Sequence, residues 1–361
     1  MKTKAPKAFP KSVSPKGGIK VVAIGGGTGL STLLKGLREY VQHSGGAATG
    51  PSIGELSAVV TVTDDGGSSG RLRKDFNILP PGDIRNCIVA LSEDQALLSR
   101  LFQYRFQGGS DLDGHSFGNL FLAALAGVTG DFAEAVRLSS EILTTRGLIF
   151  PATTSNVELE AVMDDKSRVC GETSITKSQK RIKWLELVPA DVKPLPQTLK
   201  ALAQADLITI GPGSLFTSLI PNVLVGGIPE AIANSPAVKV FVCNLMTQAN
   251  ESLGLTAADH VRAIYNHAGR RIFDYALVNR KPASAELKAK YALEAGSQIV
   301  VDTEQLEKLG VKAIFGDYLF EEDGVARHAY NTIAIDLLKL VTRKAARAAV
   351  GGRNAARAAS K

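Results

Sequence analysis

The stretch that decides the fold is IKVVAIGGGTGLSTLLKGLREY, which spans Ile19–Tyr40. Five of the six residues 19–24 are apolar, and a short apolar run of this kind predicts a buried strand. Leucines at positions 30, 33, 34 and 37 then recur at the spacing of a helix. The turn between the two consists of Gly25, Gly26, Gly27, Thr28 and Gly29.

A strand, a glycine turn and a helix N-terminus together form a site for an anion. Glycines let the backbone approach a phosphate, and the unpaired N–H groups and the helix dipole point toward it. The spacing departs from the dinucleotide pattern GxGxxG, because Leu30 stands where the third glycine would be. The same glycines also suit a plain tight turn, and both interpretations stay open.

Composition is that of a globular protein with a large core. The chain has 361 residues, of which 45% are hydrophobic and 21% charged. No apolar run approaches the ~20 residues of a membrane span, and the N-terminus lacks the apolar region of a secretory signal. Cys87, Cys170 and Cys243 lie far apart, which favours a reduced, cytoplasmic setting and argues against structural zinc.

The net charge of +7 comes from the two ends of the chain. Residues 1–18 carry five lysines and residues 342–361 carry six basic residues, with no acid in either segment. The body, residues 19–341, keeps 31 of the 42 basic residues against 35 acidic ones. We predict two disordered, solvated basic tails. Aromatic residues make up only 6% and do not alternate with basic ones, so nucleic-acid binding is not expected.

The order of the predicted elements indicates an α/β fold. We expect one Rossmann-like domain over residues 19–341, with a mostly parallel sheet flanked by helices. Residues 56–63 predict the second strand, and residues 66–83 a loop rich in glycine, serine and proline. A helical segment covers about 84–145, with Asp131 as a predicted N-cap. Alternating residues over about 148–190 predict an antiparallel β insert at one edge of the sheet.

Polar residues follow the predicted strand ends, where parallel sheets bind ligands. Directly after the second strand come Asp64, Asp65, Gly66, Gly67, Ser68, Ser69 and Arg71. The two aspartates suit a ribose or a hydrated magnesium ion, and the serines, the backbone N–H groups and the arginine suit a phosphate. A DDGG hairpin turn is the alternative, but a turn does not need two serines and an arginine.

Two further polar groups precede predicted helices. Asp83, Arg85 and Asn86 lie in PPGDIRN, where Asp83 is either a ligand contact or the N-cap of the next helix. His115 and Asn119 lie in HSFGN, where His115 either donates to a ligand or caps the helix.

The segment GPGSLFTS repeats the arrangement of strand, glycine turn and helix. It supplies Gly211, Gly213, Ser214 and Thr217, of which the last two are one helical turn apart. Two such loops on one sheet suit a ligand with more than one phosphate, such as a nucleotide diphosphate. The sequence contains no GxxxxGK[ST] P-loop and no HExxH metal motif.

VVAIGGGTGLS, VTVTDDGGSSGRLR, PPGDIRN, HSFGN and IGPGSLFTSLIPN, in this order, resemble the gluconeogenesis-factor (YvcK-like) family. That family shares a superfamily with the 2-phospho-L-lactate transferases (CofD-like). The resemblance covers about Ile19–Leu338 and implies a cytoplasmic regulator of cell shape and wall synthesis during gluconeogenic growth. It implies a UDP-sugar ligand, such as UDP-N-acetylglucosamine, and adds Asn222, Tyr291 and Arg327 as contacts. From the sequence alone, Tyr291 also suits a core position and Arg327 a surface charge.

Other functions stay open at this point. The transferase branch implies a magnesium-dependent transfer of a phospholactyl group to a deazaflavin alcohol, with Asp64 and Asp65 as metal ligands. An NAD(P)-dependent enzyme is the weaker alternative, because an acid follows the first glycine loop ~35 rather than ~20 residues on. We favour a non-catalytic binding protein, with a cell-wall enzyme or a second copy of the chain as open partners.

Overall fold

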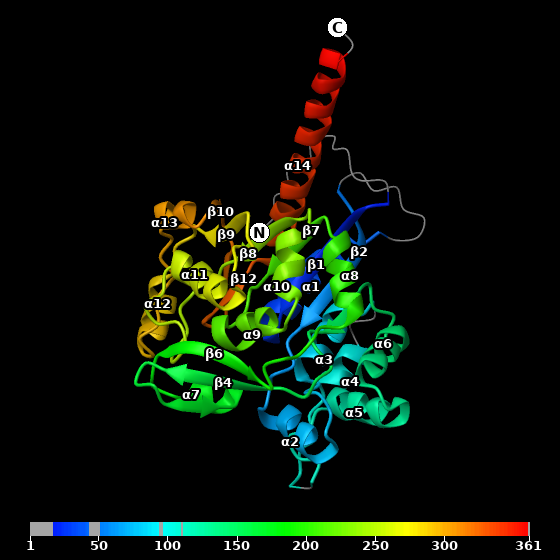
Figure 1. Ribbon diagram of the computed structural model, residues 1–361. Coiled ribbons are helices and arrows are strands. Elements are labelled where there is room, and N and C mark those ends of the chain that lie inside the picture. Colours follow the sequence, from blue (N-terminus) through cyan, green and yellow to red (C-terminus); the bar gives the residue numbers. More distant parts are fainter. Residues whose placement is uncertain (1–16, 43–50, 94–96, 110, 360–361) are drawn as a thin grey trace.

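The computed structural model describes residues 17–42, 51–93, 97–109 and 111–359. Within them, the central element is a seven-stranded sheet in the order β10-β9-β8-β7-β1-β2-β3 (Figure 1). Every pair of neighbouring strands is parallel. The strands are β1 (Ile19–Gly25), β2 (Ile53–Val60), β3 (Leu148–Pro151), β7 (Leu207–Ile210), β8 (Val238–Val242), β9 (Tyr275–Asn279) and β10 (Lys312–Gly316).

The strand order reverses between β1 and β7. From β1 the chain adds β2 and β3 on one side, and then returns to add β7 to β10 on the other. A reversal of this kind leaves a crevice beyond the carboxyl ends of the two strands that flank it. The predicted Rossmann-like α/β class is confirmed, and the two glycine loops follow the two strands at the reversal.

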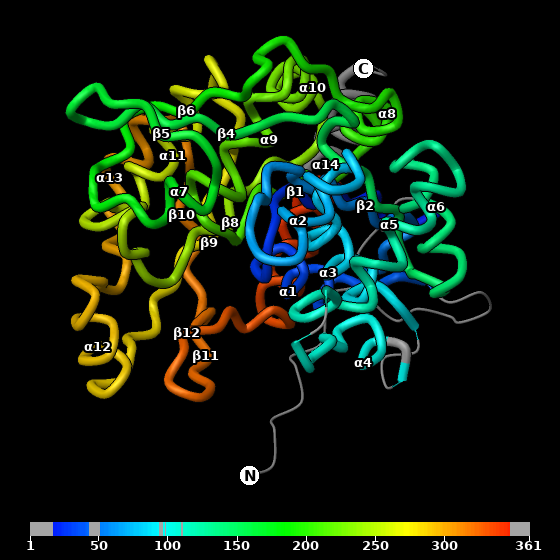
Figure 2. The backbone as a smooth tube through the Cα atoms, turned by 90° about the horizontal axis from the view of Figure 1, so that it is seen from below, coloured from blue at the N-terminus to red at the C-terminus, as the bar shows by residue number. Residues whose placement is uncertain are grey.

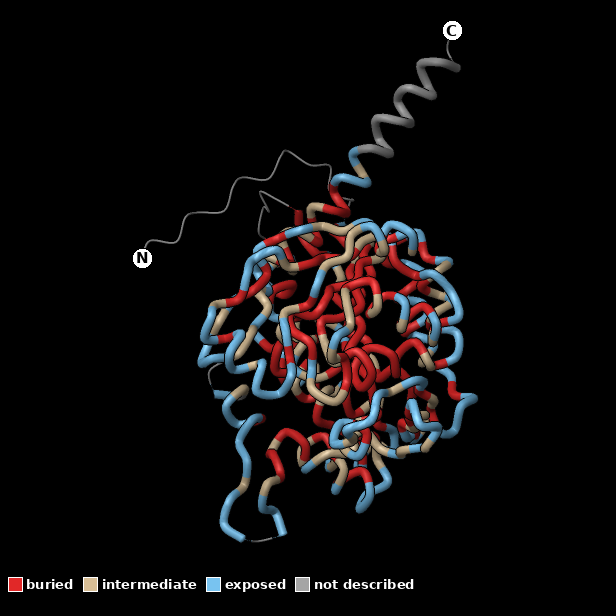
Figure 3. Tube along the Cα trace, turned by 90° about the vertical axis from the view of Figure 1, so that its left-hand side faces the viewer, coloured by how far each residue is buried: buried red, intermediate tan, exposed pale blue. Residues whose placement is uncertain are grey.

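Helices cover both faces of the sheet (Figures 1 and 2). On one face lie α8 (Pro196–Gln204), α9 (Ile220–Leu224), α10 (Ile228–Asn234) and α11 (Ala257–Ala268). On the other lie α1 (Gly27–Arg38) and α3 (Gly82–Leu91). Leu30, Leu33, Leu34 and Leu37 of α1 are all buried, as their spacing predicts. Figure 3 shows the buried residues gathered in the interior and the exposed ones mainly on the outside.

Residues 67–76 differ from the sequence prediction, which treats them as part of a loop. They form helix α2 (Gly67–Phe76), which ends at Asn77 in the left-handed conformation. The helix buries Ser68, Ser69, Leu72 and Arg73, so its inner face is mostly polar. A helix of this kind gives no apolar period, and the glycines and serines therefore suggested a loop.

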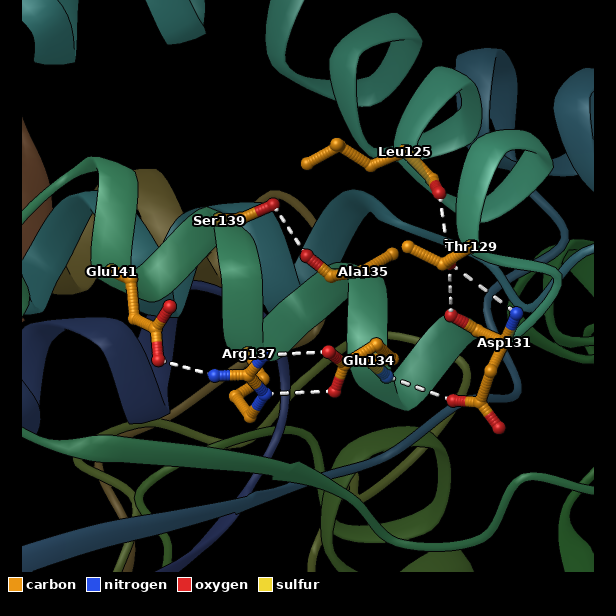
Figure 4. A network of polar contacts seen from close by, with 8 residues as sticks. All are labelled: Leu125, Thr129, Asp131, Glu134, Ala135, Arg137, Ser139 and Glu141. Atoms are coloured by element: carbon orange, nitrogen blue, oxygen red, sulfur yellow. Dashed lines mark hydrogen bonds and ion pairs between the residues drawn. The ribbon is translucent and has the colours of Figure 1, made fainter.

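The other helices of this part are α4 (Leu97–Gln103), α5 (Phe117–Thr129) and α6 (Phe132–Ile142). The predicted cap of α6 is confirmed, because Asp131 accepts the N–H of Glu134 at 2.8 Å (Figure 4). On the exposed face of this helix, Arg137 pairs with Glu134 and Glu141. Exposed pairs of this kind contribute little, so the cap and the buried face define the helix.

The antiparallel insert is shorter than predicted, and it borders the crevice rather than an edge of the sheet. Leu148–Pro151 is strand β3, which pairs with β2 in the main sheet. The insert consists of β4 (Glu158–Met163), β5 (Arg168–Cys170), α7 (Glu172–Lys177) and β6 (Ile182–Val188). It does not cover an edge of the sheet, because α7 borders the crevice at the strand ends. Alternation predicts strand pairing but does not say which surface the paired strands will cover.

Beyond the sheet, the chain forms α12 (Ala285–Ala292), α13 (Thr303–Lys308), the hairpin of β11 (Leu319–Glu322) and β12 (Val325–His328), and α14 (Tyr330–Ala359). Helix α14 includes residues 342–359, which the sequence analysis treats as disordered. Alanine and arginine are strong helix formers, and the helix has already begun at Tyr330. The predicted N-terminal tail lies outside the described residues, except for Gly17 and Gly18.

No single helix among the described residues has both the length and the apolar composition to cross a bilayer. One bent pair, Leu215–Leu224 with Ile228–Asn234, meets both criteria together and is bent by 81°.

Candidate functional site

The first glycine loop connects β1 to α1 at the reversal of the sheet. Gly26 is the N-cap of α1 with an extended backbone, and the helix begins at Gly27, whose φ is +60°. The first N–H groups of a helix have no partner within the helix. The carboxylate of Asp83 accepts the N–H of Gly27, so the amides of Thr28 and Gly29 are left for a ligand.

The second glycine loop connects β7 to the π-helix η1 (Leu215–Leu219). The side chain of Asn244 fixes this loop through both of its polar atoms. Its Oδ1 accepts the N–H of Gly213 at 3.2 Å, and its Nδ2 donates to the carbonyl oxygen of Gly213 at 2.8 Å. Ser214 accepts a hydrogen bond from Gln248 Nε2 at 3.0 Å. The N–H of Gly213 is therefore engaged inside the protein rather than left for a phosphate.

The two loops touch each other. A Cβ added to Gly29 would lie 2.2 Å from the carbonyl oxygen of Pro212, and one added to Gly213 would lie 3.6 Å from that of Gly26. Together the loops border a cavity of about 420 Å³. The sequence-predicted residues that line it are Gly26, Gly27, Thr28, Gly29, Gly213, Ser214, Thr217, Tyr291 and Arg327.

A third wall comes from the hairpin and from the segment after β8. Ala326, Arg327 and His328 of β12 line the cavity, and Tyr291 Oη accepts the N–H of Ala326 at 3.3 Å. Leu245 and Met246 add an apolar surface beside them. This end of the cavity is thus aromatic and apolar, with donors from Tyr291 and Arg327.

The fourth wall is helix α7 of the insert, which contributes Glu172 and Thr176. Asp65 holds this helix in place, because its Oδ1 accepts both the N–H and the hydroxyl of Thr173, at 2.8 and 2.6 Å. Asp65 is absent from the cavity lining and acts as a positioning residue. The prediction had placed it in contact with the ligand.

Several predicted residues form a buried network away from the cavity. Ser68 Oγ lies 3.0 Å from His115 Nδ1 and accepts from Asn119 Nδ2 at 3.0 Å. Arg85 donates to Ser116 and to Asn119, and also to Asn86. Apart from the buried Arg85 Nε, which has no partner, these side chains bond to one another, so the network fixes α2, α3 and α5 together, and none of its residues lines the cavity.

The remaining predicted residues also have structural positions. Asp83 and His115 are not helix N-caps, because Pro81 is the N-cap of α3 and Ser116 is the N-cap of α5. The exposed Arg71 donates to the carbonyl oxygen of Asp113.

Asn222 is fully buried and donates to the carbonyl oxygens of Gly25 and Ser218, so it braces both loops from behind. Gly25 and Gly211 are buried strand ends, Gly66 and Gly67 begin α2, and Ser69 packs under Gly82.

Acidic side chains gather beside the first loop. Burial raises the pKa of Asp83 to about 6, and the nearby Asp64 acts in the same direction. Burial, and then the charges of Asp64, Asp83, Asp65 and Glu251, raises the pKa of Glu172 to about 9. Glu172 is therefore protonated at neutral pH, and as a carboxylic acid it can both donate and accept hydrogen bonds.

A magnesium ion fits this region only in part. The described residues contain no group of three or more His, Cys, Asp or Glu placed to hold a metal ion. Asp65 already binds Thr173, whereas Asp64 Oδ2 has no hydrogen-bond partner among the described residues. Magnesium often takes one or two carboxylates and completes its shell with phosphate oxygens and water. Asp64 and Asp83 would supply those carboxylates.

The sequence analysis missed Thr32, Glu172, Thr176, Asn244, Gln248 and His328, all of which line the cavity. Asn244 and Gln248 follow strand β8, so the rule of the strand ends could have found them. The contribution of the insert has no signal in the sequence, because α7 is only six residues long and far from the loops along the chain.

Comparison with known proteins agrees with this architecture. The family model "2-phospho-L-lactate transferase CofD" matches residues 21–319. The gluconeogenesis factor of Bacillus subtilis (strain 168) is 45% identical over 323 residues, which are 89% of this chain and 98% of the relative. That of Halalkalibacterium halodurans is 48% identical over 319 residues, or 88% and 95%. A crystal structure of a Bacillus halodurans protein superposes with a TM-score of 0.84 at 48% identity, and covers 89% of this chain and 99% of that one.

The fold and the site thus define a protein of the CofD superfamily. Within it, the chain belongs to the gluconeogenesis-factor family, as the resemblance of its motifs predicts.

Proposed function

We propose that this protein binds a UDP-sugar, such as UDP-N-acetylglucosamine, in the cavity between the two glycine loops. The observation that carries the proposal is the contact between Gly29 and Pro212, which joins two helix N-termini at the reversal of the sheet. The amides of Thr28 and Gly29, which the first loop leaves for a ligand, suit a phosphate. A cavity of about 420 Å³ lies in the size range of small-molecule sites.

The lining of the cavity suits the two parts of a nucleotide sugar. Leu245 and Met246 suit the flat face of a base, and the Tyr291 hydroxyl suits its polar edge. Glu172, Thr176 and Gln248 suit sugar hydroxyls. The phosphates would then lie between them, at the glycine loops.

The proposal is tested by calorimetric titration of UDP-N-acetylglucosamine, with GDP and NAD as competitors. Thr28→Glu and Gly213→Glu each place a carboxylate in the phosphate region, and we expect at least tenfold weaker binding. Thr28 is exposed at the cavity, so its variant introduces no backbone strain. The control is Gly127→Glu on α5, where a side chain meets open space. Unchanged affinity in both loop variants would place the ligand elsewhere.

The ionisation of Glu172 gives a second readout. A diphosphate in the cavity is repelled once Glu172 ionises, so affinity without magnesium should fall as the pH rises from 7 toward 9.5. Magnesium would offset that fall by neutralising charge. Glu172→Gln should flatten the upper part of the profile, and a profile identical to wild type would exclude Glu172 from the ligand region.

The biological role that we propose is regulation of cell shape and wall synthesis during gluconeogenic growth, in the cytoplasm and through a wall-synthesis enzyme as partner. The name gluconeogenesis factor, which the relatives carry, supports the link to gluconeogenic growth. A strain that lacks the protein should lose normal shape on a gluconeogenic carbon source. The wild-type gene should restore shape, and Thr28→Glu should not. Full restoration by that variant would separate the role from ligand binding.

A second candidate is a magnesium-dependent phospholactyl transferase, favoured by the CofD match and by Asp64 and Asp83 at the first loop. It predicts magnesium-dependent consumption of a deazaflavin alcohol when a guanylylated phospholactate donor is supplied. Product formation that Asp64→Asn abolishes would move this activity to first place.

A further inference from the structure

His328 is a cavity residue that neither the sequence motifs nor the glycine loops explain. It is the last residue of β12, it follows Arg327, and it lies at the aromatic end of the cavity. Its Nε2 is 3.1 Å from the carbonyl oxygen of Cys243, at the end of β8. The hairpin and the sheet are joined through this ring.

The bond to Cys243 decides where the ring carries its proton. A carbonyl oxygen only accepts hydrogen bonds, so Nε2 must be the donor. Burial lowers the pKa of His328 to about 4, so the ring is neutral at physiological pH. A neutral imidazole has one N–H, and Nδ1 is therefore an acceptor. Nδ1 has no hydrogen-bond partner among the described residues. It is also not one of the side-chain atoms that are both fully buried and without a partner.

Two other residues of this wall of the cavity supply donors. Arg327 has only donors. The hydroxyl oxygen of Tyr291 already accepts the N–H of Ala326, so its proton is left to donate. One acceptor among donors is the complement of a ring edge with one N–H between two carbonyl oxygens. Uracil has that edge, whereas cytosine presents an acceptor at its N3, and guanine presents two neighbouring donors that would need two acceptors.

We propose that His328 Nδ1 accepts a hydrogen bond from the N3–H of a uracil ring, and that it makes this end of the cavity selective for uridine nucleotides. The inference rests on the proposed function and adds a residue and a reason for the choice of base. His328 is thus a specificity-determining residue rather than only a link between the hairpin and the sheet.

The experiment compares UDP-N-acetylglucosamine with its N3-methyluridine analogue by calorimetry, on the full chain. Wild type should bind the analogue roughly 10- to 100-fold more weakly, because the methyl group removes the donor and leaves Nδ1 unpaired. His328→Leu removes the acceptor, whereas His328→Gln keeps both functions, because its amide oxygen and nitrogen have the same spacing as Nδ1 and Nε2 of the ring. His328→Leu should bind the parent ligand 10- to 100-fold more weakly and should no longer distinguish the two ligands, and His328→Gln should retain the discrimination.

Inorganic pyrophosphate, used as a competitor, is the control, because it should occupy the glycine loops alone. Its affinity should be the same in wild type and His328→Leu, whereas a purely structural role for His328 would weaken both ligands and pyrophosphate alike. Equal binding of the two uridine ligands by wild type would overturn this inference and leave the proposed function intact. Failure of wild type to bind UDP-N-acetylglucosamine at all would overturn both.

Discussion

Replacing Gly29 by alanine tests the contact on which the site depends. The added Cβ would lie 2.2 Å from Pro212 O, 2.6 Å from Pro212 C and 2.9 Å from Gly213 Cα, where ordinary contact begins near 3.4 Å. All three atoms belong to the backbone, so no side chain can turn aside. The two loops would have to separate by about 1 Å, and overpacking of this kind costs about 1–3 kcal/mol.

Helix propensity acts in the opposite direction, because alanine in an α-helix is favoured over glycine by about 1 kcal/mol. The matched control is therefore Gly127→Ala, in the exposed part of α5, where the new methyl group meets nothing within 4 Å. That variant should gain about 1 kcal/mol in the free energy of unfolding, while Gly29→Ala should show a net loss.

The assays are urea denaturation and calorimetric titration of UDP-N-acetylglucosamine. We expect Gly29→Ala to bind at least tenfold more weakly, because the separated loops no longer border one cavity in the same way. If Gly29→Ala is as stable as Gly127→Ala and binds the ligand normally, the two loops do not pack as described. The reasoning for a shared phosphate site would then be refuted.

Three shorter predictions concern other parts of the molecule. Burial raises the pKa of Glu251 from 4.5 to about 7, so stability should fall as the pH rises between these values; Glu251→Gln should remove that slope in urea denaturation and gain up to about 3 kcal/mol at pH 8. The ring of His267 stacks on that of Trp184, with the two ring centroids 4.1 Å apart, and burial lowers the pKa of His267. The fluorescence of this single tryptophan should therefore change as the pH falls below 6.5, and His267→Phe should abolish the change. Thr173→Val removes one hydrogen bond to Asp65, so the rate of amide hydrogen exchange in α7 should rise. Asp65→Asn should raise that rate further.

The glycine loops could be predicted from the sequence because each is a local pattern. Gly25–Gly29 and Gly211–Ser214 each follow a short apolar strand, and parallel strands bring their carboxyl ends to one edge of the sheet. The fold class follows from the same alternation of strands and helices. Nothing more than neighbouring residues was needed for either prediction.

Long-range side-chain contacts could not be predicted in the same way. The amides of Gly27 and Gly213 are taken by Asp83 and Asn244, at sequence separations of 56 and 31 residues. Ser68 and its partners looked like ligand contacts because they are polar and near a strand end, yet they satisfy one another in a buried network. Sequence patterns identify polar residues but not the partner that each of them finds.

The cavity has walls from four separate parts of the chain, and this matters for a protein that regulates. The glycine loops belong to the sheet, but α7 is held beside them by Asp65 and Asn250, and the hairpin is bonded to the sheet through His328 and Asn279. A ligand that contacts all four walls stabilises only the arrangement in which they are together. Its binding energy is thereby coupled to the positions of the insert and the hairpin, which form part of the outer surface. Under the proposed function, a partner that touches either element could distinguish the occupied protein from the empty one without any chemical step.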